Sequence, residues 1–328
     1  MAETRQGKKQ QIKRKPQRPS GAFSAFISKI PKKYVVRAGK LLGTFIYILD
    51  RQHRRIVQRN LGFVYPEWSK EYVQQISRRV FQNIGVTFLE VCQMACFSRE
   101  DILSRVRVRG HENLLNAAKG PQGGIMISAH LGNWEMIPQF YPCYLRKPLG
   151  LVFKRVPPKV LNRWVYRFRT HFGNIAVYKK GAMSTMVRLV PKGTIFLLLI
   201  DQAPKRSEGL EATFFGRTVT VSPGAALLFR RCHTPVFLAF CIREADGSLT
   251  LVVEPPLTLK RKEDLAAELQ ENVQIMTSAI EKAIKTYPDQ WFWLHKRWKR
   301  HHPYLYPEDL GRRKRRREKR KAKALKSL

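Results

Sequence analysis

A histidine and a glutamate five residues apart are the side chains best placed to do chemistry in this sequence. His130 follows a short apolar run, residues 125–127, and Glu135 follows the pair Gly132-Asn133. An imidazole can remove the proton of a hydroxyl group, and a carboxylate can fix its tautomer and balance the imidazolium charge. The pattern predicts that His130 is a base assisted by Glu135. The alternative is a structural histidine, because this spacing also arises by chance.

The flanking residues place this pair at the end of a buried strand. The apolar run 125–127 follows two glycines, which predicts a strand. The pair Gly132-Asn133 predicts a turn, and residues 134–144 predict a helix that Pro138 and Pro142 bend or shorten. Loops at strand ends are held by a rigid sheet and remain open to ligands, so catalytic groups of α/β proteins favour this location.

The composition indicates a folded chain with a large excess of positive charge. The 328 residues include 62 Lys and Arg against 24 Asp and Glu, which gives a formal net charge of +38. A hydrophobic fraction of 44% excludes wholesale disorder, and the length suits one large α/β domain or two smaller ones. The charge favours a polyanionic partner, which can be nucleic acid, an anionic membrane surface or an acidic carrier protein.

The cysteines predict buried thiols in a reducing compartment rather than a disulfide framework or a metal site. They are odd in number, lie in apolar contexts, and have no second Cys/His pair nearby to complete a zinc site. They are Cys92, Cys96, Cys143, Cys232 and Cys241. The first thirty residues are basic and polar, so we expect no cleavable signal peptide.

Both ends of the chain are strongly basic. We predict a disordered arm over residues 1–33 and a disordered tail over residues 309–328, held to an anionic surface or, alternatively, to nucleic acid. Residues 34–49 are apolar but contain Arg37 and Lys40. This stretch is too short and too charged for a transmembrane helix. A membrane-associating helix over 34–50 and an ordinary amphipathic helix packed on the body remain equal alternatives.

The middle of the chain predicts an α/β fold. After helices at 51–61 and 69–97, short apolar strands alternate with helices, which predicts a mixed, largely parallel central sheet flanked by helices. The predicted strands are 125–128, 149–153, 175–178, 194–200, 236–241 and 249–253, and the predicted helices are 159–172, 182–190, 223–232 and 263–286. The three tryptophans in 291–298 indicate either a lipid-headgroup interface or a helix end packed in the core.

Several short segments around His130 occur in the order seen in one known family. They are residues 128–135 (Ser-Ala-His-Leu-Gly-Asn-Trp-Glu), His53-Arg54-Arg55-Ile56, Arg59-Asn60-Leu61, Tyr65-Pro66-Glu67, Asn162-Arg163, Arg169, Phe172-Gly173, Lys180-Gly181-Ala182-Met183, Asp201-Gln202, Phe214-Phe215-Gly216, Ser222-Pro223-Gly224, Glu254-Pro255-Pro256 and 290–299. Over about residues 40–300 the chain resembles the bacterial lipid A late acyltransferases, the lauroyl and myristoyl transferases of lipopolysaccharide synthesis.

The resemblance implies a glycerolipid acyltransferase-like fold with membrane-associating N-terminal helices, as a single acyltransferase domain over residues 34–308. It implies transfer of a fatty acyl chain from a thioester of acyl carrier protein or coenzyme A to a hydroxyl of a lipid A precursor. The expected location is the cytoplasmic face of the bacterial inner membrane. His130 would take the hydroxyl proton, and Glu135 would hold the opposite ring nitrogen. The thioester is a co-substrate, and no other cofactor and no metal are expected.

The resemblance also suggests residues that bind the substrate. Arg169, with backbone N–H groups near Gly132, is the candidate for stabilising the oxyanion. Asp201 ends an apolar strand and is expected to face the same cleft as His130, where it orders Arg169 or the acceptor or has a purely structural role. Lys154 is a candidate for substrate binding. We expect His171, His233 and His295 to be structural.

The block around Lys154 departs from the family pattern and leaves the acceptor open. Phe153-Lys154-Arg155 and Pro157-Pro158 stand where the family has a Tyr-Arg pair and an Asn-Pro. Another glycolipid, a lysophospholipid or an aminolipid is therefore an alternative acceptor. A nucleic-acid-binding protein without enzymatic activity is a remote alternative, because it leaves the ordered segments unexplained.

Overall fold

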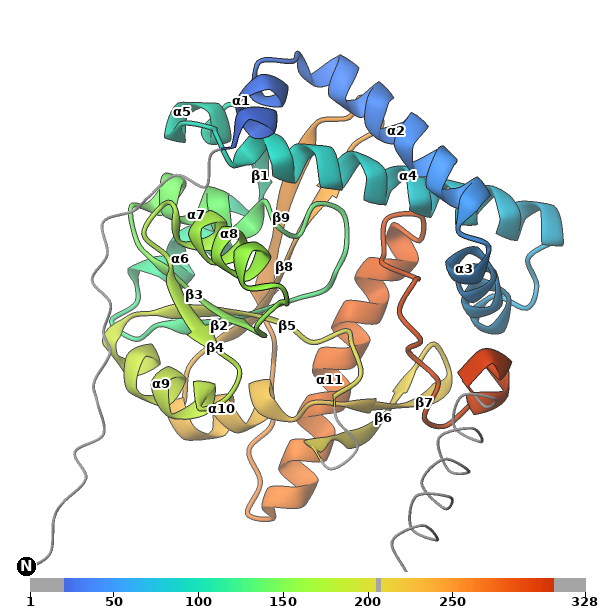
Figure 1. The fold of residues 1–328 in the computed structure, drawn as a ribbon. Helices are drawn as coiled ribbons and strands as arrows, with labels where there is room; N and C mark the ends of the chain where they lie inside the picture. The colour runs from blue at the N-terminus through green and yellow to red at the C-terminus, as the bar shows by residue number, and fades with distance from the viewer. Residues whose placement is uncertain (1–20, 205–207, 310–328) are drawn as a thin grey trace, which may run out of the picture.

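A seven-stranded sheet runs through the centre of the molecule (Figure 1). The structure is a computed structural model that describes residues 21–204 and 208–309. The strand order is β1-β9-β8-β2-β5-β3-β4, and all neighbouring strands are parallel except β8 and β9. The sheet strands are β1 (Val106–Arg109), β2 (Gly124–Ser128), β3 (Leu149–Phe153), β4 (Ile175–Tyr178), β5 (Ile195–Leu199), β8 (Val236–Arg243) and β9 (Leu249–Pro256). The predicted mixed, largely parallel sheet is confirmed.

The central strand β2 is buried along its whole length, which explains its continuous apolar sequence. It pairs with β5 on one side and β8 on the other, with Ile125 opposite Phe196 and Val236. A strand covered on both faces cannot alternate between polar and apolar residues without burying polar groups. This register is what brings the carboxyl ends of β2 and β5 together.

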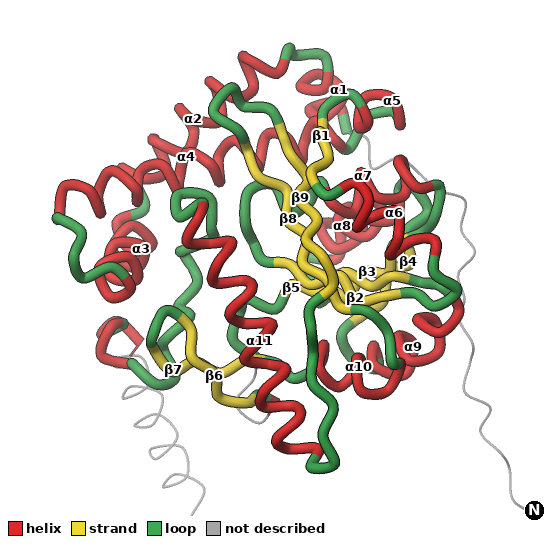
Figure 2. Tube along the Cα trace, turned by 180° about the vertical axis from the view of Figure 1, so that it is seen from behind, coloured by secondary structure: helices red, strands yellow, loops and turns green. Residues whose placement is uncertain are grey.

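Helices cover both faces of the sheet, and the two views agree on their placement (Figures 1 and 2). On one side lie α6 (His111–Lys119), α7 (Ile137–Leu145) and α8 (Lys159–Thr170), and on the other α9 (Ala182–Leu189) and α10 (Gly224–Cys232). The remaining helices are α1 (Ala22–Ser28), α2 (Lys32–Leu49), α3 (Arg51–Val64), α4 (Lys70–Met94), α5 (Arg99–Leu103) and α11 (Leu265–Thr286). Two apolar clusters form the core, with Met126 in one and Ile125 and Ile127 in the other.

The N-terminal helices are longer than predicted. Residues 21–33 contain α1 and the start of α2, so the predicted disordered arm is wrong for these residues, and its first twenty residues lie outside the described part. Contact with α4 holds this segment: Gln93 Nε2 donates to Ile27 O at 2.9 Å and to Ile30 O at 3.0 Å. The predicted tail falls outside the described residues from position 310 onward.

Helix α2 matches the segment predicted over 34–50, and one of its faces is exposed and apolar. Its exposed large side chains include Tyr34, Leu41, Phe45, Ile46, Ile48 and Leu49. Within residues 21–204 and 208–309, no helix combines the length and the apolar character needed to cross a bilayer.

Three strands were not predicted. Strand β1 is a short edge strand with alternating arginines, and β6 (Leu210–Phe214) pairs with β7 (Arg217–Val221) as an antiparallel hairpin. The turn of this hairpin is Phe215-Gly216, with φ of 53° and 66° at its two central residues. Two-residue hairpin turns favour such positive φ values, but a phenylalanine rarely adopts them, so Phe215-Gly216 is not an ordinary turn signal.

The tryptophan-rich segment is part of the core. Trp291, Trp293 and Trp298 are each at most 1% exposed, and their rings pack against one another and against Phe214 and Phe215. The lipid-headgroup interpretation of these residues is therefore wrong. The predicted packing in the core is confirmed, although the segment follows α11 as turns and is not the end of a helix.

Candidate active site

The carboxyl ends of β2 and β5 bring His130 and Asp201 together. Ser128 and Leu199 are paired at the ends of these parallel strands, and each of the two residues follows its strand by two positions. His130 Nδ1 lies 2.8 Å from Asp201 Oδ1, and the backbone N–H of His130 donates to Asp201 Oδ2 at 3.0 Å. The expectation that Asp201 faces the same site as His130 is confirmed.

Asp201 is buried and receives a further hydrogen bond from the tryptophan segment. Trp291 Nε1–H donates to Asp201 Oδ2 at 2.8 Å. Burial raises the pKa of this carboxyl, but the interactions with His130 and the bond from Trp291 lower it more, to about 2. Asp201 is therefore an ionised acceptor, which requires that the proton on His130 Nδ1 points toward it.

The prediction that Glu135 binds the imidazole is wrong. We expected Glu135 to hold a ring nitrogen of His130, but Asp201 makes that bond and Glu135 pairs with Arg169 instead. Arg169 Nε–H donates to Glu135 Oε2 at 3.2 Å, and Arg169 Nη2 contacts Glu135 Oε1. The reason is topological: the turn after His130 directs Glu135 toward α8, while the neighbouring strand β5 ends beside the imidazole.

The second imidazole nitrogen is free to act as a base. Among the described residues, His130 Nε2 has no hydrogen-bond partner, and the side chain is 22% exposed beside the rings of Trp134 and Phe292. Burial lowers the pKa of the imidazole, but Asp201 and the more distant Glu135 raise it more, so it lies above its ordinary value. With Nδ1–H bonded to Asp201, the lone pair of Nε2 is available to accept a proton.

Arg169 is paired with Glu135 but remains within electrostatic range of His130. Its guanidinium influences the titration of His130 and lies 5.7 Å from the ring centre of Phe153. Burial lowers the Arg169 pKa, but the neighbouring Glu135 carboxylate raises it more, so the group is a permanent cation. The Glu135–Arg169 ion pair, from the turn and from α8, therefore lies within electrostatic range of His130, and its carboxylate affects the imidazole more than its guanidinium does.

The backbone N–H groups of Gly132 and Asn133 do not fit the predicted oxyanion role. The N–H of Gly132 donates to Gln290 O at 3.0 Å, and that of Asn133 donates to Cys241 O at 2.8 Å. Both donors are used within the protein, so Gly132 N–H and Asn133 N–H are not available to an oxyanion. For the other N–H groups of the turn, the oxyanion role stays a prediction. Gly132 instead permits the turn, with φ of 60° and no room for a Cβ, which would lie 2.0 Å from Cys241 O.

Lys154 lies at the same edge of the sheet but has no direct contact with His130. It follows β3 and is exposed, and Lys179 and Lys180 follow the paired strand β4. Lys179 binds Glu208, with Nζ 3.0 Å from Oε2. The edge of the sheet next to β5 is therefore cationic.

Trp291 is a residue whose position in the site was not predicted. Its indole donor reaches Asp201 because residues 290–292 run beside the turn: Leu131 forms a bridge with Trp291, and Phe292 N donates to His130 O at 3.0 Å. The segment 290–299 resembles the family in sequence, but nothing in its spacing indicates that Trp291 binds Asp201.

Among the described residues, no group of three or more His, Cys, Asp or Glu side chains could hold a metal ion.

Comparisons with known proteins identify the family of the chain. The family described as "Bacterial lipid A biosynthesis acyltransferase" matches residues 20–300. The chain is 24% identical over 276 residues to the lipid A biosynthesis palmitoleoyltransferase of Escherichia coli (strain K12). The aligned region covers 82% of this chain and 86% of that protein. It is 22% identical over 276 residues to the lauroyltransferase of the same organism, with 83% and 88% covered. The chain therefore belongs to the bacterial lipid A biosynthesis acyltransferase family.

Proposed function

We propose that this acyltransferase moves a fatty acyl chain from an acyl thioester to a hydroxyl group of a lipid A precursor, with His130 as the general base. The observation that carries the proposal is the His130–Asp201 pair: a buried carboxylate holds Nδ1–H at 2.8 Å and leaves Nε2 open. A hydroxyl is a poor nucleophile near neutral pH, and a positioned base contributes about 10²–10⁴-fold to the rate.

The step needs no covalent intermediate on the enzyme, because the thioester is already activated. His130 Nε2 takes the hydroxyl proton as the hydroxyl oxygen attacks the thioester carbonyl carbon. The tetrahedral intermediate then collapses, the C–S bond breaks, and the imidazolium returns the proton to the leaving thiolate. Asp201 stabilises the imidazolium formed between these steps. An ester and a free thiol are the products.

The guanidinium of Arg169 is the group proposed to stabilise the oxyanion. It is a permanent cation within electrostatic range of His130, and Glu135 fixes its orientation through two hydrogen bonds. A positioned cation in a partly buried site stabilises negative charge much more than it does in water. Glu135 then acts on the reaction through Arg169 and through its field at the imidazole, rather than by holding a ring nitrogen.

The acceptor and the donor are both anionic, which agrees with the charge of the chain. Lys154 and its neighbours at the carboxyl edge of β3 and β4 offer exposed cations for phosphate groups of either substrate. The acyl donor is proposed to be a thioester of acyl carrier protein or of coenzyme A, and no other cofactor is proposed.

The enzyme is proposed to work at the cytoplasmic face of the bacterial inner membrane. Exposed apolar side chains on α1 and α2, such as Phe26, Leu41 and Phe45, alternate with basic residues such as Arg37 and Lys40. An apolar face flanked by cations suits the interface of an anionic bilayer, where each basic residue near the surface adds about 1 kcal/mol.

The test is acyl transfer by purified protein, followed by mass spectrometry of the products. Acyl carrier protein and coenzyme A thioesters are each offered with a lipid A precursor, a lysophospholipid and an aminolipid. We expect an added acyl chain on the lipid A precursor only, and its loss in His130→Ala. His53→Ala is the matched control, because His53 Nδ1 also binds a carboxylate, Asp50, at 2.6 Å. Transfer to another acceptor, or full activity of His130→Ala, would overturn the proposal.

A further inference from the structure

A buried ion pair stands behind the turn that joins His130 and Glu135. Glu90 of α4 and Arg243 at the end of β8 are each 7% exposed. Arg243 Nη1 and Nη2 donate to Glu90 Oε1 and Oε2 at 2.5 and 2.7 Å, and Asn133 Nδ2 donates to Glu90 Oε2 at 2.7 Å. One carboxylate therefore binds a cation from the sheet and an amide from the turn.

The same elements hold the turn at further points. Thr87, one helical turn before Glu90, donates from Oγ1 to Gly132 O at 3.3 Å. The backbone N–H and C=O of Arg243 bind the side chain of Gln290, each at 2.8 Å, and the carbonyl of Gln290 accepts from Gly132 N at 3.0 Å. Arg243 thus connects α4 with the turn and with the segment whose Trp291 binds Asp201.

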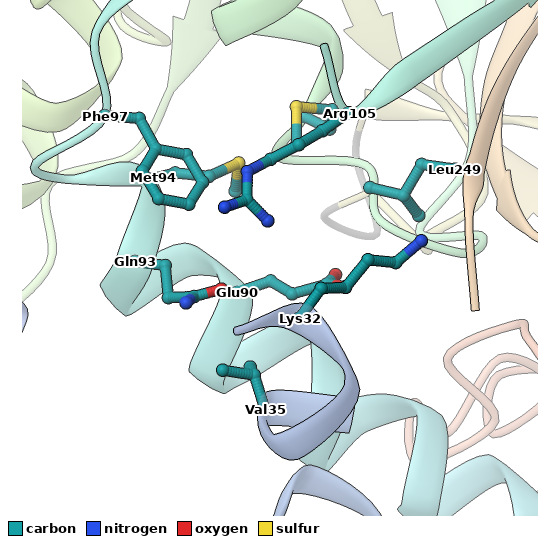
Figure 3. A pocket seen from close by; sticks show the side chains of 9 residues that line it. Lys32, Val35, Glu90, Gln93, Met94, Phe97, Arg105 and Leu249 are labelled. Atoms are coloured by element: carbon teal, nitrogen blue, oxygen red, sulfur yellow. The ribbon is translucent and has the colours of Figure 1, made fainter. Parts of the chain in front are cut away.

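On its other side, Glu90 faces a narrow cavity between α2 and α4 (Figure 3). The side chain of Lys32 extends beside Glu90 in this cavity, and Gln93 and Arg105 also line it. The cavity has room for about one water molecule, which is too little for a substrate. The Glu90 carboxylate therefore has cations on two sides and acts inside the protein, not as a binding site.

Stability alone does not account for this arrangement. Two charges lose their hydration when they are buried, and replacing a buried ion pair with apolar residues of similar volume is often neutral or stabilising. The pair instead orients the turn, because its fixed hydrogen bonds hold Asn133 in one position. The residues on either side of this turn are His130, the proposed base, and Glu135, the partner of Arg169.

We propose that Glu90 and Arg243 are positioning residues for acyl transfer, which hold the 132–133 turn so that His130 and Glu135 keep their places. The proposal rests on the proposed role of His130 as the base. A displacement of about 1 Å in a reacting group can lower the rate about 10²-fold. Removing the pair is expected to lower kcat by about that factor, with little change in KM for the thioester.

The experiment uses the full-length double variant Glu90→Met/Arg243→Met, which removes both charges together and leaves neither one buried alone. Its thermal unfolding, kcat, KM and the pH profile of kcat/KM are measured beside those of the parent protein. The matched control is Arg230→Met/Glu268→Met, since Arg230 Nη1 binds the fully buried Glu268 on α10 and α11, away from the turn. His130→Ala is measured in parallel.

We expect the Glu90→Met/Arg243→Met protein to unfold near the parent temperature, to lose kcat about 100-fold, and to shift the acidic limb of its pH profile to lower pH. That shift follows if the looser turn weakens the bond between His130 and Asp201, and a purely structural role would not produce it. The control is expected to keep the parent kcat and pH profile.

A folded double variant with parent kcat and an unchanged pH profile overturns the inference, even when His130→Ala is inactive. Full activity of His130→Ala overturns the proposed function instead, so the two failures are distinct. If the double variant does not fold, Asn133→Leu replaces it, because it cuts the link to the turn and keeps the ion pair. A parent-like kcat and pH profile for Asn133→Leu then overturns the inference.

Discussion

At the residue scale, the partner of the imidazole is decided by hydrogen bonding and not by distance along the chain. Asp201 lies 71 positions from His130 and binds its Nδ1, whereas Glu135 lies five positions away and binds Arg169. Two acidic residues close to one imidazole have therefore taken different roles. Asp201 fixes the tautomer, and Glu135 orients the cation that is proposed to stabilise the oxyanion.

The two acids can be separated by substitution. In Asp201→Asn an uncharged amide replaces the carboxylate that accepts from His130 Nδ1–H. The tautomer of His130 is then no longer fixed, and the imidazolium has no negative charge beside it. We expect kcat to fall by about 10²–10⁴-fold. Glu135→Gln keeps the His130–Asp201 pair, and we expect it to lower kcat by about tenfold by loosening Arg169. Steady-state kinetics with acyl thioester measures both, and a larger loss in Glu135→Gln would contradict this assignment.

The pH dependence of the reaction follows from the same pair. The proposed mechanism needs an unprotonated Nε2, and the pKa of His130 is raised, so kcat/KM is expected to fall as the pH drops through a value above 6.5. Trp291→Phe removes a donor to Asp201 and leaves that carboxylate free to bind a proton more readily. We expect its acidic limb to change by several tenths of a pH unit, as measured from kcat/KM between pH 5 and 9. An unchanged limb would mean that Asp201 does not act through the imidazole.

The stability that this pair contributes has a defined pH window. The pKa of Asp201 falls from 3.8 to about 2 on folding, so its contribution is present above pH 3.8 and is lost as the pH falls toward 2. This shift corresponds to about 2 kcal/mol. The His130 pKa is raised, so its share of the same interaction is present below pH 6.5 and is lost as the pH rises through the folded value. Urea unfolding of the parent and of Asp201→Asn at pH 3, 5 and 8 measures the difference.

At the scale of elements, the turn between β2 and α7 is set by its neighbours. Its glycine has a positive φ and lies against the carbonyl of Cys241, and three other segments bind its backbone or side chains: α4, the end of β8 and residues 290–292. A turn held in this way cannot adapt to a side chain at that glycine.

Gly132→Ala is therefore expected to be severe. The new Cβ would lie 2.0 Å from Cys241 O and would require a left-handed backbone conformation that costs about 1–2 kcal/mol before any clash is counted. We expect loss of both stability and activity, measured by thermal unfolding and kcat. Gly62→Ala on α3 is the control: nothing lies within 4 Å of its Cβ position, so we expect a neutral or slightly stabilising effect.

At the scale of the whole molecule, the sheet carries the candidate site, and α1 and α2 carry an exposed apolar surface. The sheet and its covering helices bury two apolar clusters, while α1 and α2 expose large apolar side chains toward solvent. These helices are not loosely attached, because Gly39 and Gly85 bring α2 and α4 into backbone contact. A rigidly attached apolar face, flanked by cations, can orient the site relative to a membrane.

This surface gives a binding prediction. Replacing Leu41, Phe45 and Leu49 on α2 by Ser removes side chains that are 60–73% exposed, so the fold is expected to change little. Co-sedimentation with anionic vesicles is expected to weaken by at least tenfold, because burying each such side chain contributes about 1.5–3 kcal/mol. Leu265→Ser on α11, at 47% exposure, is the control. Unchanged binding by the α2 variant would place the membrane contact elsewhere.

The sequence by itself determined most strands of the central sheet and the location of the proposed base. Apolar runs bounded by glycine and charged residues predict β3 and β4 with their observed bounds, and the Gly132-Asn133 turn puts His130 at a strand end. These features are local: strand formation, turn geometry and helix periodicity depend on residues a few positions apart. The ordered segments over residues 40–300 added the family in the same way.

Only the tertiary structure decided which side chains meet. The pairing of Ser128 with Leu199 brings Asp201 to His130, the packing of α8 brings Arg169 to Glu135, and the return of residues 290–292 brings Trp291 to Asp201. These contacts join positions up to 161 residues apart (His130 to Trp291) in one site. Strand order and helix packing are set by burial of the whole apolar surface, so the spacing of residues along the chain does not predict these contacts.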